Sequence, residues 1–288
     1  MTITGPGRTL YATDLDGTLL GEDGTLSAGS RAILDGLLAD GLALAVATAR
    51  SAATARRGLG DLALEQPMVV YGGATAVDPA SGEHLWWDAF DPRVLSPLIG
   101  ASMAAGVTPL VFHLTSEQDG GRDRISWVRG AETAGVDAFL EARPGDDRLL
   151  ALDGWDEVDH DRAFFVSLTG DLPVLRRLAR MVRAISWGTG CALALQPAGD
   201  GLAVLDVTPA HATKGTAVRR VAELGGFTRI VALGDGANDL PMFAEADESY
   251  ATASATAEVR AAATGTVPAG PDAVARFLAE RMALGAEV

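Results

Sequence analysis

Asp14 and Asp16 stand two residues apart, directly after the apolar run 9–13 and directly before Gly17. The apolar run predicts a buried strand, so both carboxylates fall at its carboxyl end, where open α/β sheets bind ligands. The Asp14 carboxylate and the backbone carbonyl of Asp16 could both reach one hard cation such as Mg²⁺. A carboxylate beside such a cation can attack phosphorus, and a second one can move protons to a leaving group and from water.

Two other interpretations of this segment have to be weighed. An acidic turn after a strand is often only a turn, so the pair alone leaves catalysis and a plain turn open. A calcium-binding EF-hand loop needs an oxygen ligand at its fifth position, glycine at the sixth and glutamate at the twelfth. Counted from Asp14, those positions hold Thr18, Leu19 and Thr25, so we set the calcium loop aside.

Lys214 is the only lysine among the 23 basic residues of the chain. It opens a helical pattern that runs from Thr216 to Leu224. An exposed lysine on a helix turn is the common case, and a preference for arginine across a genome could produce the same bias. An ammonium group is nevertheless a compact point charge that suits a phosphoryl oxygen and a carboxylate together.

A second acidic loop follows the apolar run 229–233 and contains Asp235, Asn238 and Asp239. A helical pattern follows at 240–246, so these side chains also lie just past a strand end. Clustered carboxylates repel one another unless a cation lies among them. The two acidic loops together therefore imply a divalent metal more strongly than either does alone.

A third strand end follows the apolar run 42–47, where Thr48-Ala49-Arg50-Ser51 begins. A hydroxyl, exposed amides and the start of a helix form an anion site. Thr48 and Ser51 could instead simply cap the helix, and the two interpretations are compatible.

These segments together resemble the haloacid dehalogenase-like phosphohydrolases. The four motifs of that family occur in order: Asp14-x-Asp16-Gly17-Thr18, Thr48, Lys214, and Gly234-Asp235-x-x-Asn238-Asp239. The resemblance covers residues 8–82 and 196–288. The long insert between the second and third motifs is similar to that of the Cof-type subfamily, whose type IIB cap is an α/β domain at this place.

The resemblance implies a role for each acidic motif residue. Asp14 would be the nucleophile and Asp16 the general acid/base. Both, with Asp235, would be ligands of Mg²⁺, and Asp239 would support the metal and the lysine from the second shell.

The resemblance also implies which residues hold the substrate. Thr48 and Lys214 would be catalytic residues that hold the transferring phosphoryl group. Ala49, Arg50 and Asn238 would bind the substrate beside them.

The chain departs from the subfamily pattern at two places. Thr48-Ala49-Arg50 replaces Thr-Gly-Arg, which is tolerable if the backbone at Ala49 has a negative φ. Tyr71-Gly72-Gly73 replaces Asn-Gly-Ala, which weakens any inference about the substrate. Neither change removes one of the four chemical groups.

The alternation of strand and helix patterns in the first third predicts a parallel sheet with crossover helices. The fold class is therefore α/β, with a Rossmann-like core at 1–90 and 198–288 and an α/β cap at 91–197. Residues 21–27 are predicted to form a polar flap over the first acidic loop, and a hairpin is predicted at 74–90, with strands 74–78 and 84–90. The cap is predicted to contain helices 92–105, 131–141 and 171–184 and strands 107–114, 124–129, 147–152, 163–169, 185–189 and 191–196. The chain then returns to the core with the strand 203–208.

Composition limits the partners of the protein. The net charge of −15 argues against nucleic acid and anionic membranes, which need a basic surface. No apolar run is long enough for a membrane span, and residues 1–8 lack a signal pattern. We expect a cytoplasmic monomer or homodimer whose partner is a small-molecule phosphate ester.

The sequence thus predicts a Mg²⁺-dependent phosphatase that hydrolyses a small phosphomonoester, with sugar phosphates as the leading class, through an aspartyl-phosphate. Two alternatives stay open. A phosphomutase uses the same core and returns the phosphoryl group to a sugar, and a non-catalytic phosphate-ligand sensor could keep the fold.

Overall fold

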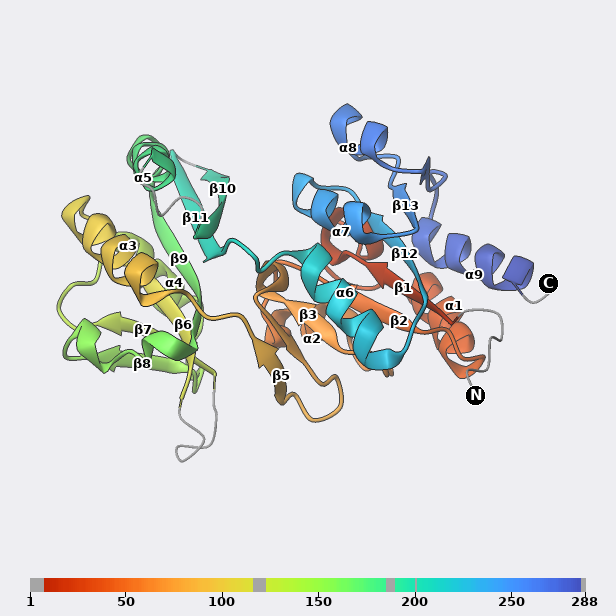
Figure 1. Ribbon diagram of the computed structural model, residues 1–288, viewed down its shortest axis with the longest axis horizontal. Helices are drawn as coiled ribbons and strands as arrows, with labels where there is room; N and C mark the ends of the chain where they lie inside the picture. The colour runs from red at the N-terminus through yellow and green to blue at the C-terminus, as the bar shows by residue number, and fades with distance from the viewer. Residues whose placement is uncertain (1–7, 116–122, 185–189, 200, 286–288) are drawn as a thin grey trace. The chain divides into compact units, whose positions relative to one another are not determined.

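A computed structural model describes residues 8–115, 123–184, 190–199 and 201–285. The chain forms two compact units, residues 1–86 with 213–288 and residues 87–212. The predicted α/β class with a parallel-sheet core and an inserted α/β unit is confirmed (Figure 1). None of the described helices has the length and hydropathy that a membrane span needs.

The first unit contains an eight-stranded sheet with the order β14-β13-β12-β1-β2-β3-β4-β5. The strands from β14 to β3 pair in parallel, and β4 runs antiparallel to β3. Their bounds are β1 Thr9–Thr13, β2 Leu44–Ala47, β3 Met68–Val70, β4 Thr75–Val77, β5 His84–Trp87, β12 Arg229–Gly234, β13 Glu248–Ala251 and β14 Gly265–Thr266.

The central strands of this sheet are almost wholly buried, because helices cover them. Apolar residues of α6, α7 and α8 form one core with residues of β1, β2, β3 and β12. Figure 1 shows α6 lying over β2 and β3. The helices of this unit are α1 Ala28–Ala39, α2 Ala52–Leu59, α6 Lys214–Gly225, α7 Leu240–Glu245, α8 Ala257–Ala262 and α9 Ala273–Gly285.

The second unit contains a six-stranded sheet with the order β10-β11-β9-β6-β7-β8, antiparallel except for the pair β7–β8. The apolar faces of α3 and α5 form its main core with the sheet. Its elements are α3 Pro92–Ala104, β6 Leu110–Leu114, β7 Asp123–Val128, α4 Ala134–Glu141, β8 Leu149–Leu152, β9 Ala163–Asp171, α5 Leu172–Ala184, β10 Cys191–Gly199 and β11 Leu202–Pro209.

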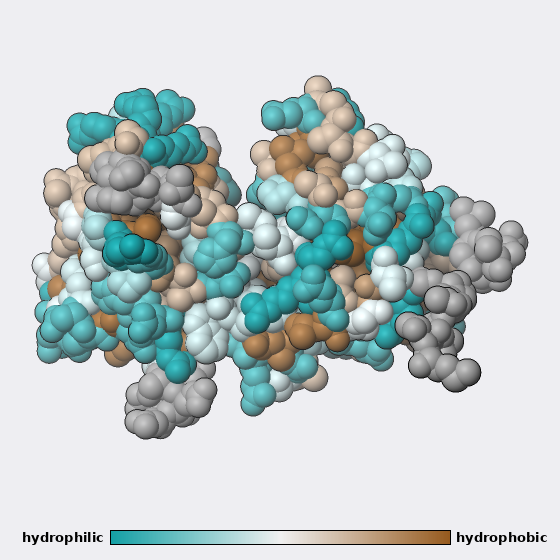
Figure 2. Space-filling model, viewed as in Figure 1, coloured by the Kyte–Doolittle hydropathy of each residue, from teal (hydrophilic) through white to brown (hydrophobic). Residues whose placement is uncertain are grey.

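Helix α5 illustrates how the sequence positions these layers. Its buried residues Leu175, Leu178 and Val182 recur at helical spacing, and the arginines between them are exposed. Figure 2 shows the resulting hydrophilic surface over α5.

The return to the core differs from the prediction. Residues 203–208 lie within β11, which pairs with β9 and β10 in the second sheet, so this unit extends to Ala212. The reason is visible in the pattern, since Ala203, Leu205 and Val207 are buried and alternate with partly exposed residues. Strict alternation is typical of a half-covered antiparallel strand, whereas the parallel core strands are buried on both faces. The strand predicted at 185–189 lies outside the described residues.

Candidate active site

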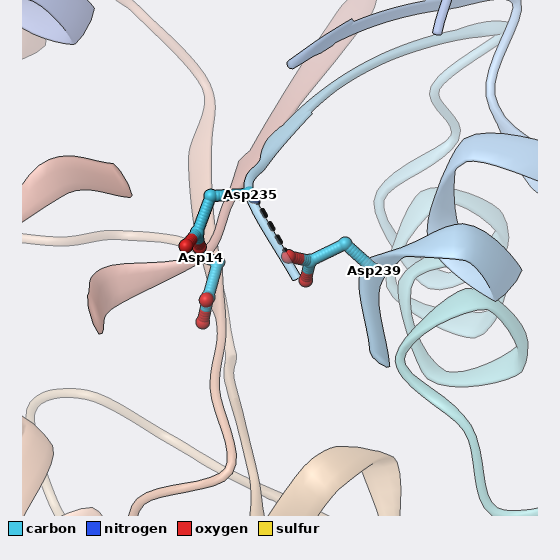
Figure 3. Close-up of side chains that lie close together, drawn as sticks. All are labelled: Asp14, Asp235 and Asp239. Atoms are coloured by element: carbon cyan, nitrogen blue, oxygen red, sulfur yellow. Dashed lines mark hydrogen bonds between the residues drawn. The ribbon is translucent and has the colours of Figure 1, made fainter. Parts of the chain in front are cut away.

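Sheet register brings the two acidic loops together. Thr13 at the end of β1 pairs with Leu233 of β12, and the backbone N–H of Asp14 donates to the Leu233 carbonyl at 2.9 Å. Because both strands run in the same direction, Asp14 and Asp235 emerge at the same edge of the sheet. Figure 3 shows these two carboxylates with that of Asp239, and one oxygen of each lies within 4.8 Å of the others.

The single lysine binds two of these carboxylates from a buried position. Its Nζ lies 2.7 Å from Asp14 Oδ1 and 2.7 Å from Asp239 Oδ1, and only 1% of the side chain is exposed. Burial by itself lowers the pKa of Lys214, but Asp14 and Asp239 outweigh it, so the pKa is raised. The site therefore holds a permanent ammonium charge between two acids.

At Asp14, in contrast to Lys214, the effect of burial on the pKa outweighs the effect of the neighbouring opposite charge. Burial raises the pKa of Asp14 to about 7, while the Lys214 ammonium favours the ionised form and the nearby Asp239 disfavours it. The pKa of Asp235 is also raised, by burial and by Asp239, against a hydrogen bond from Thr18. A divalent cation beside Asp14 and Asp235 would favour both carboxylates.

Asp239 is fully buried, and both of its oxygens already have partners. Oδ2 accepts the backbone N–H of Asp235 at 3.0 Å, the dashed line in Figure 3. It also accepts the backbone N–H of Gly236 at 2.9 Å, and Oδ1 accepts from Lys214. These bonds fix the loop that carries Asp235. The oxygens with room for a cation are therefore those of Asp14 and Asp235, a set of hard donors that fits Mg²⁺.

Asp16 is turned toward Arg50 and is not part of this cluster. The guanidinium binds its carboxylate in a bidentate pair, with Nε 2.8 Å from Oδ2 and Nη2 2.5 Å from Oδ1. The Asp16 side chain keeps 56% of its surface exposed. The sequence predicted that Arg50 binds the substrate. In the structure its guanidinium instead binds the Asp16 carboxylate.

Thr48 and Ala49 lie in the loop between β2 and α2. The buried Thr48 hydroxyl accepts the backbone N–H of Arg50 at 3.1 Å, and its carbonyl accepts that of Gly72. Ser51, and not Thr48, is the N-cap of α2, since its hydroxyl accepts from Thr54 N. Ala49 is exposed and has no positive φ, so alanine causes no backbone strain there.

Asn238 lies in the short 3₁₀ turn Ala237–Asp239 and is exposed. Its Oδ1 would lie 2.5 Å from a Cβ built on Gly236, so the amide folds back over the loop that carries Asp235. The structure thus brings Asp14, Lys214, Asp235 and Asp239 into direct contact range, with Asn238 on the neighbouring surface.

Two glycines let the motifs approach one another. Gly17 has φ +73°, and a Cβ there would lie 2.2 Å from Asp235 Oδ2. Gly73 has φ +109°, and a Cβ there would lie 2.2 Å from the carbonyl of Thr213, the residue before Lys214. Sequence reasoning noted Gly73 only as part of a departure from the family pattern. Because Gly73 has no side chain, the backbone that carries Lys214 can pack against it. These two segments lie far apart in the sequence, so no local sequence pattern predicts the contact.

A model of the haloacid dehalogenase-like hydrolase family matches residues 11–118 and 194–278. The chain therefore belongs to that family, as its four motifs predicted, and the inserted α/β unit follows the second motif.

Solved structures of similar fold include BT1666 from Bacteroides thetaiotaomicron, studied among phosphatases of this superfamily, with 17% identity, 97% of each chain covered and a TM-score of 0.71. TM0651 from Thermotoga maritima has 19% identity, covers 94% of this chain and 97% of its own, and has a TM-score of 0.71. The subclass IIB sugar phosphatase BT4131 has 19% identity, with 96% and 99% covered and a TM-score of 0.71. The sequence matches none of the curated proteins.

Proposed function

We propose that this hydrolase is a Mg²⁺-dependent phosphatase that cleaves a small phosphomonoester through an aspartyl-phosphate, with sugar phosphates as the leading class of substrate. The observation that carries the proposal is the buried ammonium of Lys214 between Asp14 and Asp239, beside Asp235 at the strand ends. The sugar-phosphatase activity named for BT4131, a protein of similar fold, supports the substrate class.

In the proposed reaction, an oxygen of the Asp14 carboxylate attacks phosphorus in line with the ester oxygen. The P–O bond to the alcohol breaks, and Asp16 gives its proton to the leaving alkoxide. Water then attacks the aspartyl-phosphate, Asp16 takes a proton from that water, and inorganic phosphate leaves with Asp14 regenerated. Each cycle consumes one water and releases one alcohol and one phosphate.

The other residues of the site position charge around the phosphoryl group. Lys214 holds Asp14 in place and offers its ammonium to a phosphoryl oxygen, and the Thr48 hydroxyl can donate to another. Asp14, Asp235 and the backbone carbonyl of Asp16 would hold Mg²⁺, which when bound screens the repulsion between the nucleophile and the anionic ester. Asp239 positions Lys214 and the Asp235 loop.

The test is phosphate release from a panel of phosphomonoesters with Mg²⁺, for the wild type and Asp14→Asn. The exposed Asp40, at the end of α1, supplies the matched control Asp40→Asn. We expect release by the wild type and Asp40→Asn, and at least about a 10³-fold loss in Asp14→Asn or with a chelator.

Other outcomes separate the alternatives. Isomerised sugar phosphate without free phosphate would indicate a phosphomutase, and ligand binding without turnover would indicate a sensor. Full release by Asp14→Asn would refute the assignment of the nucleophile.

A further inference from the structure

The guanidinium of Arg50 connects three segments of the first unit. Besides the bidentate pair with Asp16, its Nη1 donates to the carbonyl of Gly24 at 3.2 Å and to that of Thr54 at 3.3 Å. Gly24 lies in the flap 21–27, and Thr54 lies in the first turn of α2. One planar group therefore joins the loop after β1, the flap and α2.

Two glycines leave the space that this group occupies. A Cβ built on Gly24, where φ is +73°, would lie 2.9 Å from Arg50 Nη2. A Cβ built on Gly58 of α2 would lie 2.7 Å from Arg50 Nη1. Side chains at Gly24 and Gly58 would occupy the space of the guanidinium, so the two glycines leave room for the Arg50 side chain.

The flap has two other attachments to distant segments of the unit among the described hydrogen bonds. The backbone N–H of Leu26 donates to the carbonyl of Gly58, and the Ser27 hydroxyl donates to the Asp272 carboxylate. The hydrogen bonds among residues 21–25 close the turn on itself. A cavity of about 370 Å³ lies beside the flap, lined in part by Leu20, Gly21 and Ser27. Among these contacts of the flap, the Arg50 guanidinium is the group that also binds Asp16.

We propose that Arg50 is a positioning residue that aligns the Asp16 carboxylate with the flap, and that it is not a ligand of the phosphoryl group. An exposed aspartate samples several rotamers, and a bidentate guanidinium fixes one of them. The pair uses one acceptor site on each carboxylate oxygen, so an outward-facing lone pair remains that can carry the proton that Asp16 gives to the leaving alkoxide. This inference rests on the proposed function, in which Asp16 supplies that proton.

Leaving-group dependence tests the role. The ester p-nitrophenyl phosphate releases a stable phenolate and needs little general acid, whereas a simple alkyl phosphate needs the proton. In Arg50→Ala we expect kcat/KM to fall by about 10–100-fold more for the alkyl ester than for the aryl ester. Arg50→Lys should behave like Arg50→Ala, because an ammonium cannot form the fork.

Arg57, exposed on helix α2 directly after the Arg50 loop, provides the matched control, and Arg57→Ala should leave the turnover of both esters unchanged. Gly58→Ala should show the same selective loss without removing a charge, because its methyl group would lie 2.7 Å from Arg50 Nη1 and 2.8 Å from the Gly24 carbonyl and so disturb the contact between them. Thermal unfolding of each variant separates these effects from loss of the fold.

In Arg50→Ala, an equal loss of kcat/KM on both esters, or a rise in KM with unchanged kcat, would overturn the proposal. Either result would indicate that Arg50 binds the substrate. Wild-type turnover with an inactive Asp14→Asn variant keeps the proposed function intact in either case.

Discussion

Each of the two units has a carboxylate, in or just after a strand, whose pKa burial raises, and different groups oppose the effect of burial in the two cases. Asp14, past the end of β1, lies 2.7 Å from the ammonium of Lys214. Asp206, within β11, accepts the hydroxyl of Ser167 at 2.8 Å, and within the described part of the chain it makes no ion pair. Burial raises the pKa of Asp206 to about 6, and the serine hydrogen bond opposes this only in part.

The comparison shows that burial alone does not identify a catalytic carboxylate. A hydroxyl offsets burial only in part, so the pKa of Asp206 lies at about 6. The Lys214 ammonium also favours the charged form of Asp14, but burial still raises the pKa of Asp14 to about 7. What distinguishes Asp14 is therefore its surroundings, a buried cation and a neighbouring Asp235 carboxylate, beside which a divalent cation would favour the ionised form that nucleophilic attack requires.

Removing the cation should produce the largest effect. Lys214→Met leaves Asp14 and Asp239 buried without a countercharge, which should lower the free energy of unfolding by about 3–5 kcal/mol and abolish turnover. The matched change on the same helix is Arg219→Met, whose partner Glu245 is exposed, and it should cost less than about 1 kcal/mol. Denaturant unfolding measures both, and equal losses would contradict the importance of the buried pair.

Displacing the backbone that carries the cation should have the next largest effect. Gly73→Ala puts a methyl group against the carbonyl of Thr213, so we expect a loss of about 3 kcal/mol and weaker activity. Gly72→Ala is the control, because that glycine also has a positive φ but open space beside it, and it should cost about 1 kcal/mol. Unchanged turnover in both variants would show that the Gly73 contact does not position Lys214.

Neutralising the carboxylate of the second unit should affect stability and not turnover, with a size that depends on pH. The folded pKa of Asp206 is about 6 against an ordinary 3.8, so the folded state binds the proton more tightly. This contribution to stability is complete below pH 3.8 and is lost as the pH rises through about 6. Wild type and Asp206→Asn should therefore be equally stable near pH 4, and the variant should be more stable by up to about 3 kcal/mol at pH 8.

The exposed Asp153 of the same unit supplies the control for this experiment. The stability difference between wild type and Asp153→Asn should not change over the same pH range. If the stability difference between wild type and Asp206→Asn also did not change with pH, the pKa of Asp206 would not be raised in the folded protein.

Much of the fold could be predicted from the periodicity of apolar residues, but the pairing of one strand could not. Apolar runs at 9–13, 42–47 and 229–233 predicted β1, β2 and β12, because parallel strands buried on both faces leave an unambiguous pattern. The strand 203–208 was recognised as a strand but assigned to the wrong sheet. A sequence pattern shows how many faces of a strand are buried, but pairing partners are chosen by neighbours distant in the chain.

The sequence by itself determined the types of chemical group and the strand ends that carry them. Asp14, Lys214 and Asp235 could be selected because carboxylates, one lysine and strand termini leave local signals. Tertiary structure decided the partners: Lys214 meets Asp14 and Asp239, Arg50 meets Asp16, and Gly73 meets Thr213. Those contacts depend on sheet register and on which backbones can approach closely, and both arise only when segments far apart in the chain pack together.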